Sequence, residues 1–196
     1  VCVGTGVGTA AMVGGRLVLG AQGLVEGGHI TTAAVSAPDS LSSSSTLARL
    51  CGCGQRGYLE AYASGGAIAA IAAESSGLCK FCRTPPSAAD VFGLADTAPE
   101  AMEIVDAAAA HLSRGCLAMA RCYDPELFIF AGGVVMGAGT SFLSRIEAHF
   151  RAQNWRLGSS NTPDAALDVA TATDTAAADS SSPLPKFRLS SLGEAA

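Results

Sequence analysis

One histidine and two closely spaced cysteines form the most reactive combination in this sequence. Cys51 and Cys53 are separated by a single glycine, and His29 ends the run Glu26-Gly27-Gly28-His29. Thiolate sulfur and imidazole nitrogen are ligands that zinc prefers, and a glycine-rich loop can wrap closely around a small ion. The pattern therefore predicts a zinc site held by His29, Cys51 and Cys53.

The fourth ligand of this site is not evident from the sequence. Tyr58 stands where a further cysteine would close the loop, and a phenol is a poor zinc ligand. A second cysteine pair, Cys79 and Cys82, could join Cys51 and Cys53 in an all-thiolate site that excludes His29, although we favour ordinary loop thiols. The sequence leaves open whether the site is weak, empty, or completed by water or another thiol.

Two carboxylates, Glu26 and Glu60, flank the expected metal loop. A purely structural zinc loop does not need them. Carboxylates accept hydrogen bonds in two directions, which suits the neighbouring hydroxyls of a sugar. The alternative is that both are solvated acids, with Glu60 facing a helix N-terminus. We interpret the pair as a binding site for a polar small molecule.

Two glycine turns could bind phosphate. Gly4-Thr5-Gly6-Val7-Gly8 interrupts an expected strand between residues 1 and 13, and Gly132-Gly133 follows a short apolar strand at residues 127–131. Glycine lets a phosphate approach the backbone, so that N–H groups and the Thr5 hydroxyl can donate to it. A plain glycine-kinked hairpin is the alternative for either turn alone, but together they favour phosphate binding.

The elements that position these residues follow from hydrophobic spacing. Gly14-Gly15 predicts a two-residue hairpin turn, and residues 127–131 read as a strand buried on both faces. Helices are expected at residues 59–73, 99–121 and 141–152, the second with Thr97 as N-cap and Glu100 completing a capping box. Helix, strand, glycine turn and helix indicate an α/β layer architecture.

The remaining segments carry little periodicity. Residues 36–46 are rich in serine and are expected to form a solvated insertion, and residues 78–88 a loop. Residues 159–196 are dominated by Ala, Ser, Thr and Asp. We therefore expect one domain at residues 1–158, followed by a low-complexity, disordered tail.

Composition narrows the class of protein. The chain has 196 residues, of which 49% are hydrophobic, and a net charge of -5, which gives no reason to expect nucleic acid or an anionic membrane as partner. Seven cysteines, an odd number, do not suggest a disulfide framework and fit a reducing compartment, so a cytoplasmic location is expected. No apolar run approaches the ~20 residues of a membrane span.

These motifs, taken in order, resemble the ROK family of sugar kinases and related repressors over residues 1 to about 152. The segments that carry the resemblance are Gly4-Thr5-Gly6-Val7-Gly8 with Gly14-Gly15-Arg16-Leu17, Glu26-Gly27-Gly28-His29, Cys51 through Gly65, and Asp124-Pro125-Glu126 through Gly132-Gly133-Val134. The resemblance implies the C-terminal domain of an actin-like ATPase (ribonuclease H-like) fold. The N-terminal domain would precede Val1 and be absent from this chain.

The resemblance also implies roles for individual residues. Binding of a hexose or N-acetylhexosamine would fall to Glu26, His29 and Glu60, with zinc on His29, Cys51 and Cys53. ATP phosphates would contact Gly4, Thr5 and Gly6, and the adenosine would lie near Gly132 and Gly133. The family reaction transfers the γ-phosphoryl group of Mg-ATP to a sugar hydroxyl, commonly O6.

In the family the catalytic aspartate lies in the N-terminal domain. We therefore expect a fragment of a sugar kinase that is inactive alone. Two alternatives remain: the sugar-sensing half of a ROK-type transcriptional repressor, for which nucleic acid would be a partner, and a degenerate, non-catalytic sugar-binding protein, favoured by Tyr58. The helix expected at residues 99–121 could serve a homo-oligomer interface.

Overall fold

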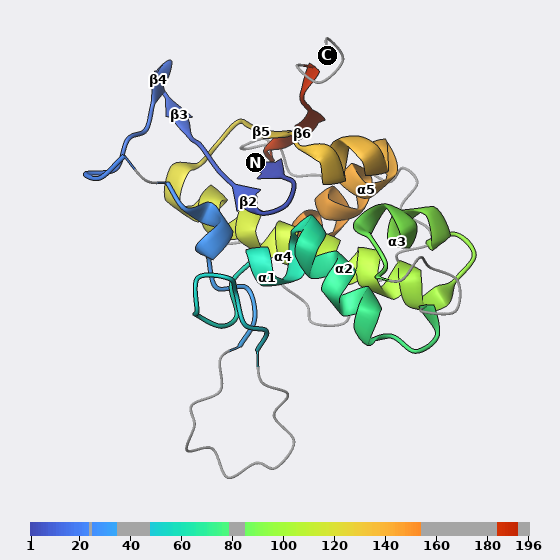
Figure 1. Cartoon of the computed structure of the whole chain (residues 1–196). Coiled ribbons are helices and arrows are strands. Elements are labelled where there is room, and N and C mark those ends of the chain that lie inside the picture. The colour runs from blue at the N-terminus through green and yellow to red at the C-terminus, as the bar shows by residue number, and fades with distance from the viewer. Residues whose placement is uncertain (24, 35–47, 79–84, 154–183, 192–196) are drawn as a thin grey trace.

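The computed structural model describes residues 1–23, 25–34, 48–78, 85–153 and 184–191. It is an α/β arrangement in which short strands lie against a layer of helices (Figure 1). The elements are β1 (Cys2–Val3), β2 (Val7–Gly8), β3 (Met12–Val13), β4 (Arg16–Leu17), the 3₁₀ helix η1 (Gly27–His29), α1 (Glu60–Ala63), α2 (Gly65–Glu74), α3 (Ala88–Leu94), α4 (Pro99–Tyr123), β5 (Leu127–Phe130), α5 (Gly133–Ala152) and β6 (Lys186–Leu189).

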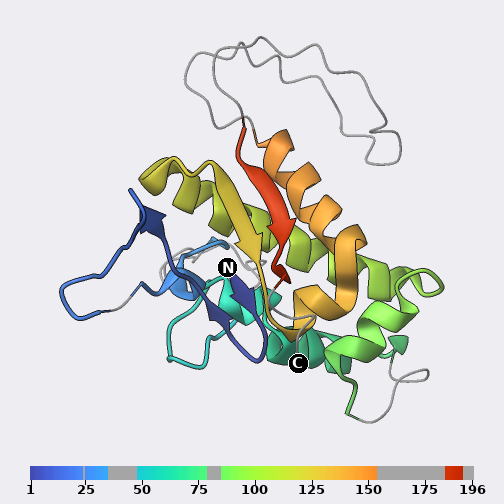
Figure 2. The same ribbon diagram turned by 90° about the horizontal axis from the view of Figure 1, so that it is seen from above.

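Strand β5 is the centre of the strand layer. It pairs in parallel with β6, with Leu127 opposite Lys186. On its other side the first residues of the chain run alongside, because the Val3 amide donates to the Ala131 carbonyl at 2.8 Å and β1 pairs antiparallel with β2. Figure 2 shows β5 and β6 side by side over the helices α4 and α5. The first and last described strands therefore meet on β5.

The two faces of β5 are not equally buried. Phe128 and Phe130 face the helices and are buried, whereas Leu127 and Ile129 are exposed, Ile129 by 52%. The prediction of a strand buried on both faces is therefore wrong for the described part of the chain. A continuous apolar run identifies a strand, but it does not say which faces other elements will cover.

Helix α4 is the longest element and carries much of the core. Its buried side chains recur at three- and four-residue spacings, among them Val105, Leu112 and Cys116, which confirms the predicted helix. The predicted cap is wrong: Ala98 is the N-cap without a side-chain bond, and the Thr97 hydroxyl donates to the Leu94 carbonyl at 3.2 Å.

Two helices differ from their expected limits. The helix expected at residues 59–73 is broken at Ser64, whose extended backbone ends α1 and whose hydroxyl oxygen accepts the Ala67 amide at 3.1 Å to begin α2. Helix α3 was not expected. It begins at a capping box in which the Ser87 side chain accepts the Asp90 amide while Asp90 accepts the Ser87 amide.

Helix α5 contains the expected helix at residues 141–152 and extends back to Gly133, with a kink at Gly139. Its N-cap, Gly132, has a φ of 93°, and a Cβ placed there would meet the backbone of Val3. Only glycine combines that φ with such a close approach. The turn after β5 therefore brings the start of α5 against β1.

The end of the chain differs from the expected disordered tail. Residues 186–189 form β6, and Phe187 packs with Phe128, Phe130 and Phe150 at ring-centroid distances of 5.2–5.7 Å. The rest of the expected tail, residues 159–183 and 192–196, lies outside the described residues, as do the insertion at 36–46 and both Cys79 and Cys82. Among the described helices, none has the length and apolar character needed to cross a membrane.

Candidate functional site

The cysteine loop is a tight hairpin. An antiparallel bridge joins Leu50 and Arg56, and the Cys51 amide donates to the Gln55 carbonyl at 2.7 Å. The loop is fixed to α2 from outside, since both terminal guanidinium nitrogens of Arg49 donate to the Glu74 carboxylate at 2.7–2.8 Å. The backbone thus holds both cysteine side chains within one short turn.

His29 lies at the end of η1, which brings its side chain next to the cysteine loop. The Gly27 amide donates to the Thr9 hydroxyl oxygen at 2.8 Å, which fixes the start of η1. Gly28 lies directly against the Val7 carbonyl oxygen, and a Cβ there would collide with it. The two glycines of the Glu-Gly-Gly-His motif therefore let η1 pack on β2, and this packing sets the position of Glu26 and His29.

The structure brings the three expected metal ligands together. A ring nitrogen of His29 and the sulfur atoms of Cys51 and Cys53 all lie within 4.8 Å of one another. Zn–S and Zn–N bonds of about 2.3 and 2.0 Å place tetrahedral ligand atoms some 3.5–4 Å apart, so the cluster fits a zinc ion after small adjustments. Burial raises the pKa of the Cys51 thiol, and metal binding would release its proton.

Both predicted sugar-binding carboxylates lie beside this cluster. One oxygen of Glu60 (Oε2) accepts the Val7 amide at 2.9 Å, and the other (Oε1) is 3.7 Å from the Cys51 sulfur, which donates to it. The Glu26 carboxylate lies 3.8 Å from His29 Nδ1, with its side chain 55% exposed. Glu26, His29 and Glu60 thus surround one small region next to the metal loop.

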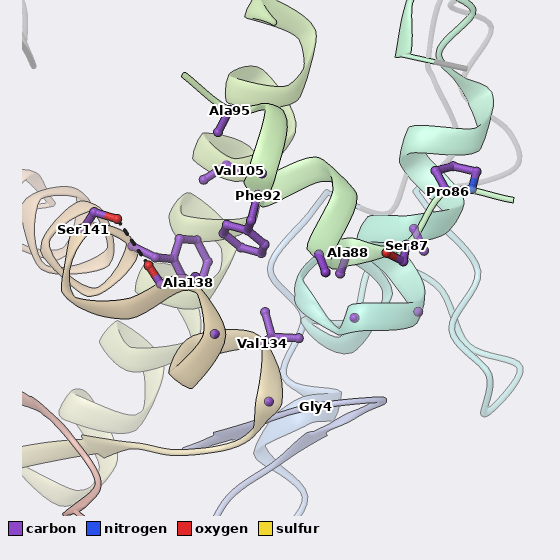
Figure 3. A pocket seen from close by; sticks show the side chains of 18 of the residues that line it. Gly4, Pro86, Ser87, Ala88, Phe92, Ala95, Val105, Val134, Ala138 and Ser141 are labelled. Atoms are coloured by element: carbon purple, nitrogen blue, oxygen red, sulfur yellow. Dashed lines mark hydrogen bonds between the residues drawn. The ribbon is translucent and has the colours of Figure 1, made fainter. Parts of the chain in front are cut away.

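A cavity of about 1030 Å³ opens on the other side of the β1–β2 turn. Gly4, Thr5 and Gly133 line it, whereas Gly6 and Gly132, also predicted to contact ATP, do not. In Figure 3, Gly4 and Val134 lie on one wall, and Phe92 points inward from α3. The two predicted phosphate turns therefore meet at one cavity, each through part of its residues.

The β1–β2 turn lies between the two regions. Its Gly4 carbonyl accepts the Gly65 amide at 2.7 Å at the cavity wall. Its Gly6 packs against the Glu60 carboxylate, which a Cβ at this position would meet. A ligand in the cavity and a ligand on Glu60 would therefore approach each other across three residues of backbone.

Sequence reasoning missed the far wall of the cavity. Helix α3 and the residues before it supply Pro86, Ser87 and Phe92, and α5 supplies Arg145. The capping box formed by Ser87 and Asp90 was a readable sign of a helix start. The contribution of Arg145 had no such signal, because it depends on how α5 packs.

A family of known proteins matches the part of the chain that forms this arrangement. The model of the ROK family matches residues 1–180. This chain belongs to the ROK family. The match extends beyond the region where the motifs alone indicate the resemblance, which ended near residue 152.

Curated relatives are ROK-type sugar kinases of greater length. N-acetylmannosamine kinases of Yersinia pestis and Yersinia pseudotuberculosis are 34% identical to the chain over 149 residues, which is 76% of this chain and 44% of those proteins. The chain therefore spans less than half of the length of these relatives. It is homologous to sugar kinases of this family.

Solved structures confirm the α/β fold class, that of the actin-like ATPases. A ROK hexokinase from Thermus thermophilus matches with a TM-score of 0.67 and 24% identity, over 98% of this chain and 51% of that one. A Streptomyces griseus ROK glucokinase in complex with glucose and AMPPNP matches with a TM-score of 0.65 and 25% identity, over 96% and 53%. A ROK transcriptional regulator matches with a TM-score of 0.60 and 24% identity, over 78% and 37%.

Proposed function

We propose that this chain carries part of a ROK sugar kinase that phosphorylates a hexose or N-acetylhexosamine with Mg-ATP. The observation that best supports this is the position of the β1–β2 turn, with Glu60 against Gly6 on one side and the cavity at Gly4 and Thr5 on the other. Phosphoryl transfer depends mainly on bringing the hydroxyl and the terminal phosphate together. A turn of three residues between the two sites achieves that.

The sugar would bind beside the metal loop. Glu26 and Glu60 would accept hydrogen bonds from sugar hydroxyls, and His29 would contribute a further polar contact. The curated N-acetylmannosamine kinases favour an N-acetylhexosamine and the glucokinase structure favours glucose. We propose the class rather than one sugar, with O6 as the hydroxyl that receives the phosphoryl group.

The nucleotide would occupy the cavity. Thr5 offers its hydroxyl to phosphate oxygens, while the Gly4 amide already donates to the Gly6 carbonyl at 2.9 Å. Gly133 begins α5, whose N-terminus favours negative charge. Arg145, which is also paired with Asp106 at 3.5 Å, lines the same cavity, as does the acidic Asp96. Magnesium would neutralise the phosphates. Because the phosphoryl donor is ATP, we place the protein in the cytoplasm.

Zinc on His29, Cys51 and Cys53 would help to position the proposed sugar-binding residues. It would join η1 to the cysteine loop and so fix Glu26 relative to Glu60, which contacts Cys51 directly. Rigid support of this kind holds binding groups in the geometry that a ligand needs.

The first prediction concerns sugar binding. We expect Glu26→Gln to weaken the affinity for N-acetylmannosamine or glucose by about tenfold, because one charge-assisted hydrogen bond is lost. Isothermal titration of the whole chain with each sugar, with and without Mg-AMPPNP, measures this. At position 60, Glu60→Gln is the proper variant, because an amide oxygen can still accept the Val7 amide whereas alanine would leave it unpaired.

Glu147→Gln is the matched control, since Glu147 is paired with Arg151 on α5 and does not line the cavity or the metal cluster. Equal affinity of the Glu26→Gln and Glu147→Gln variants would contradict the assigned role, and no saturable binding of any hexose would overturn the proposal.

The same titrations separate the kinase proposal from the two alternatives. A degenerate sugar-binding protein, which the loss of a cysteine at Tyr58 favours, would bind sugar without Mg-AMPPNP. The likeness to a ROK transcriptional regulator shows only a shared fold. A sugar-sensing half of such a regulator would also bind sugar alone. The kinase proposal requires both ligands to bind.

A further inference from the structure

The metal cluster has three ligands where a closed zinc site has four. Among the described residues, His29, Cys51 and Cys53 form a group of metal-ligating side chains, and no fourth His, Cys, Asp or Glu has a ligand atom within the same 4.8 Å. Structural zinc sites are almost always closed by four protein ligands, whereas sites with three protein ligands keep one position for an external ligand. The cluster therefore has the donor set of an open site.

Tyr58 occupies the place from which a fourth ligand would come. Its backbone forms an antiparallel bridge with Thr31, and its ring lies against the His29 ring with centroids 5.3 Å apart. A side chain at position 58 therefore reaches the cluster. A phenol, however, is not among the groups that normally bind zinc in proteins.

The neighbouring carboxylates do not fill the position. One oxygen of Glu60 accepts a hydrogen bond from the Val7 amide. Its other oxygen accepts from the Cys51 sulfur but does not share the 4.8 Å group with His29 and Cys53. Glu26 approaches His29 alone and is more than half exposed. Cys53 is itself exposed, so small molecules can reach the cluster from solvent.

We propose that the metal held by His29, Cys51 and Cys53 has an open fourth coordination position that binds a small external thiol. The thiol binds as its thiolate and releases its proton to solvent. Such a site exchanges its metal more readily than a closed one. The proposal rests on the metal site alone and does not depend on which sugar or nucleotide the protein binds.

Cobalt, which has visible absorption and replaces zinc, tests this directly. The cobalt-loaded whole chain is titrated with 2-mercaptoethanol while the sulfur-to-cobalt charge-transfer band is followed. We expect the band to rise by about half, as two thiolate ligands become three. In Tyr58→Cys the band should already have that intensity and should not respond to added thiol. Tyr58→Ser, the matched variant without sulfur, should behave like the wild type.

Affinity provides the second measurement, by competition with a zinc chelator. We expect Tyr58→Cys to bind zinc more tightly by about tenfold or more, because a fourth ligand closes the site. Tyr58→Phe should bind zinc as the wild type does. A clear loss of affinity in Tyr58→Phe would identify the phenol as the ligand and overturn the proposal.

A further variant excludes other cysteine ligands. Cys79→Ser with Cys82→Ser should leave the cobalt spectrum and its response to thiol unchanged. If this double variant lowers the charge-transfer band or the zinc affinity, a group of the protein already closes the site and the proposal fails. A wild-type chain that binds neither cobalt nor zinc also overturns it, whatever the sugar titrations show.

Discussion

His111 is linked to the cysteine loop through Tyr62 but is not one of the expected metal ligands. Its Nδ1 lies 2.9 Å from the Thr32 hydroxyl, and its ring stacks on Tyr62 with centroids 4.0 Å apart. The Tyr62 hydroxyl in turn accepts the Arg49 amide, two residues before Cys51. Burial, and to a lesser degree the charge of Arg114, lowers the pKa of His111 from 6.5 to about 4.

This lowered pKa predicts a pH-dependent stability. Because the unfolded chain takes up a proton on His111 near pH 6.5 and the folded chain only near pH 4, the contribution of the neutral ring is present above about pH 6.5 and is lost as the pH falls toward 4. We expect a loss of about 1–2 kcal/mol, after allowing for partial exposure. Urea unfolding across this pH range measures it.

His111→Asn should be less stable at neutral pH and should lose most of this pH dependence. His149→Gln is the matched control on another helix, since His149 lies 3.0 Å from Asp106 and outside the metal loop's support. If His111→Asn kept the full slope between pH 6.5 and 4, His111 would not be the group responsible.

At the scale of elements, the turn between β5 and α5 is the most constrained. Gly132 has a φ of 93° and lies against the Val3 backbone, while a Cβ at Gly133 would meet nothing within 4 Å. We expect Gly132→Ala to destabilise the fold by more than about 2 kcal/mol, since both the φ and the contact oppose a side chain. Gly133→Ala, the matched control, should change stability by less than about 1 kcal/mol.

Thermal and urea unfolding of the two variants test this pair. Similar stabilities would mean that β1 does not lie against the turn as the structure has it. Because Gly4 and Gly133 both line the cavity, loss of that packing would also displace the two expected phosphate-binding turns relative to each other.

Elements with a strong local signal could be predicted from the sequence. The apolar spacing of α4 and the Gly14-Gly15 turn between β3 and β4 are local patterns, and both are confirmed. The break at Ser64 was not predicted, because the alanine-rich segment around it has a helical pattern that continues on both sides of the cap. The exposure of Ile129 could not be predicted, since it depends on what other segments leave uncovered.

In the candidate site, too, the features with a local sequence signal could be predicted and those set by tertiary packing could not. The grouping of His29, Cys51 and Cys53 followed from residue types and spacing, and the structure brings them together. The cavity did not follow, because its far wall is α3 and its two charged lining residues, Asp96 and Arg145, are placed by tertiary packing. The roles of the predicted sugar and ATP residues stay predictions.

At the scale of the whole molecule, β6 adds a strand from the end of the chain to β5. Phe187 joins the aromatic side chains Phe128, Phe130 and Phe150. We expect Phe187→Ala to lower the free energy of unfolding by about 1–3 kcal/mol, because a large, half-buried side chain that packs against the core is removed. Lys186→Ala, at an exposed position of the same strand, should change it by less than about 0.5 kcal/mol.

Equal stability of the Phe187→Ala and Lys186→Ala variants would show that β6 does not pack on β5. The expectation of a disordered tail would then apply to residues 186–189 as well.

The central place of β5 has a consequence for the order in which the chain folds. The backbone nitrogen of Val1 donates to the Ile129 carbonyl across 128 residues, whereas the cysteine hairpin closes within a few residues. Contacts between distant parts of a chain form slowly because a long loop must first be closed. We therefore expect the hairpin to take shape early and β1 to join β5 late. The two cysteines of the proposed metal site would then be positioned before the cavity proposed for the nucleotide is complete.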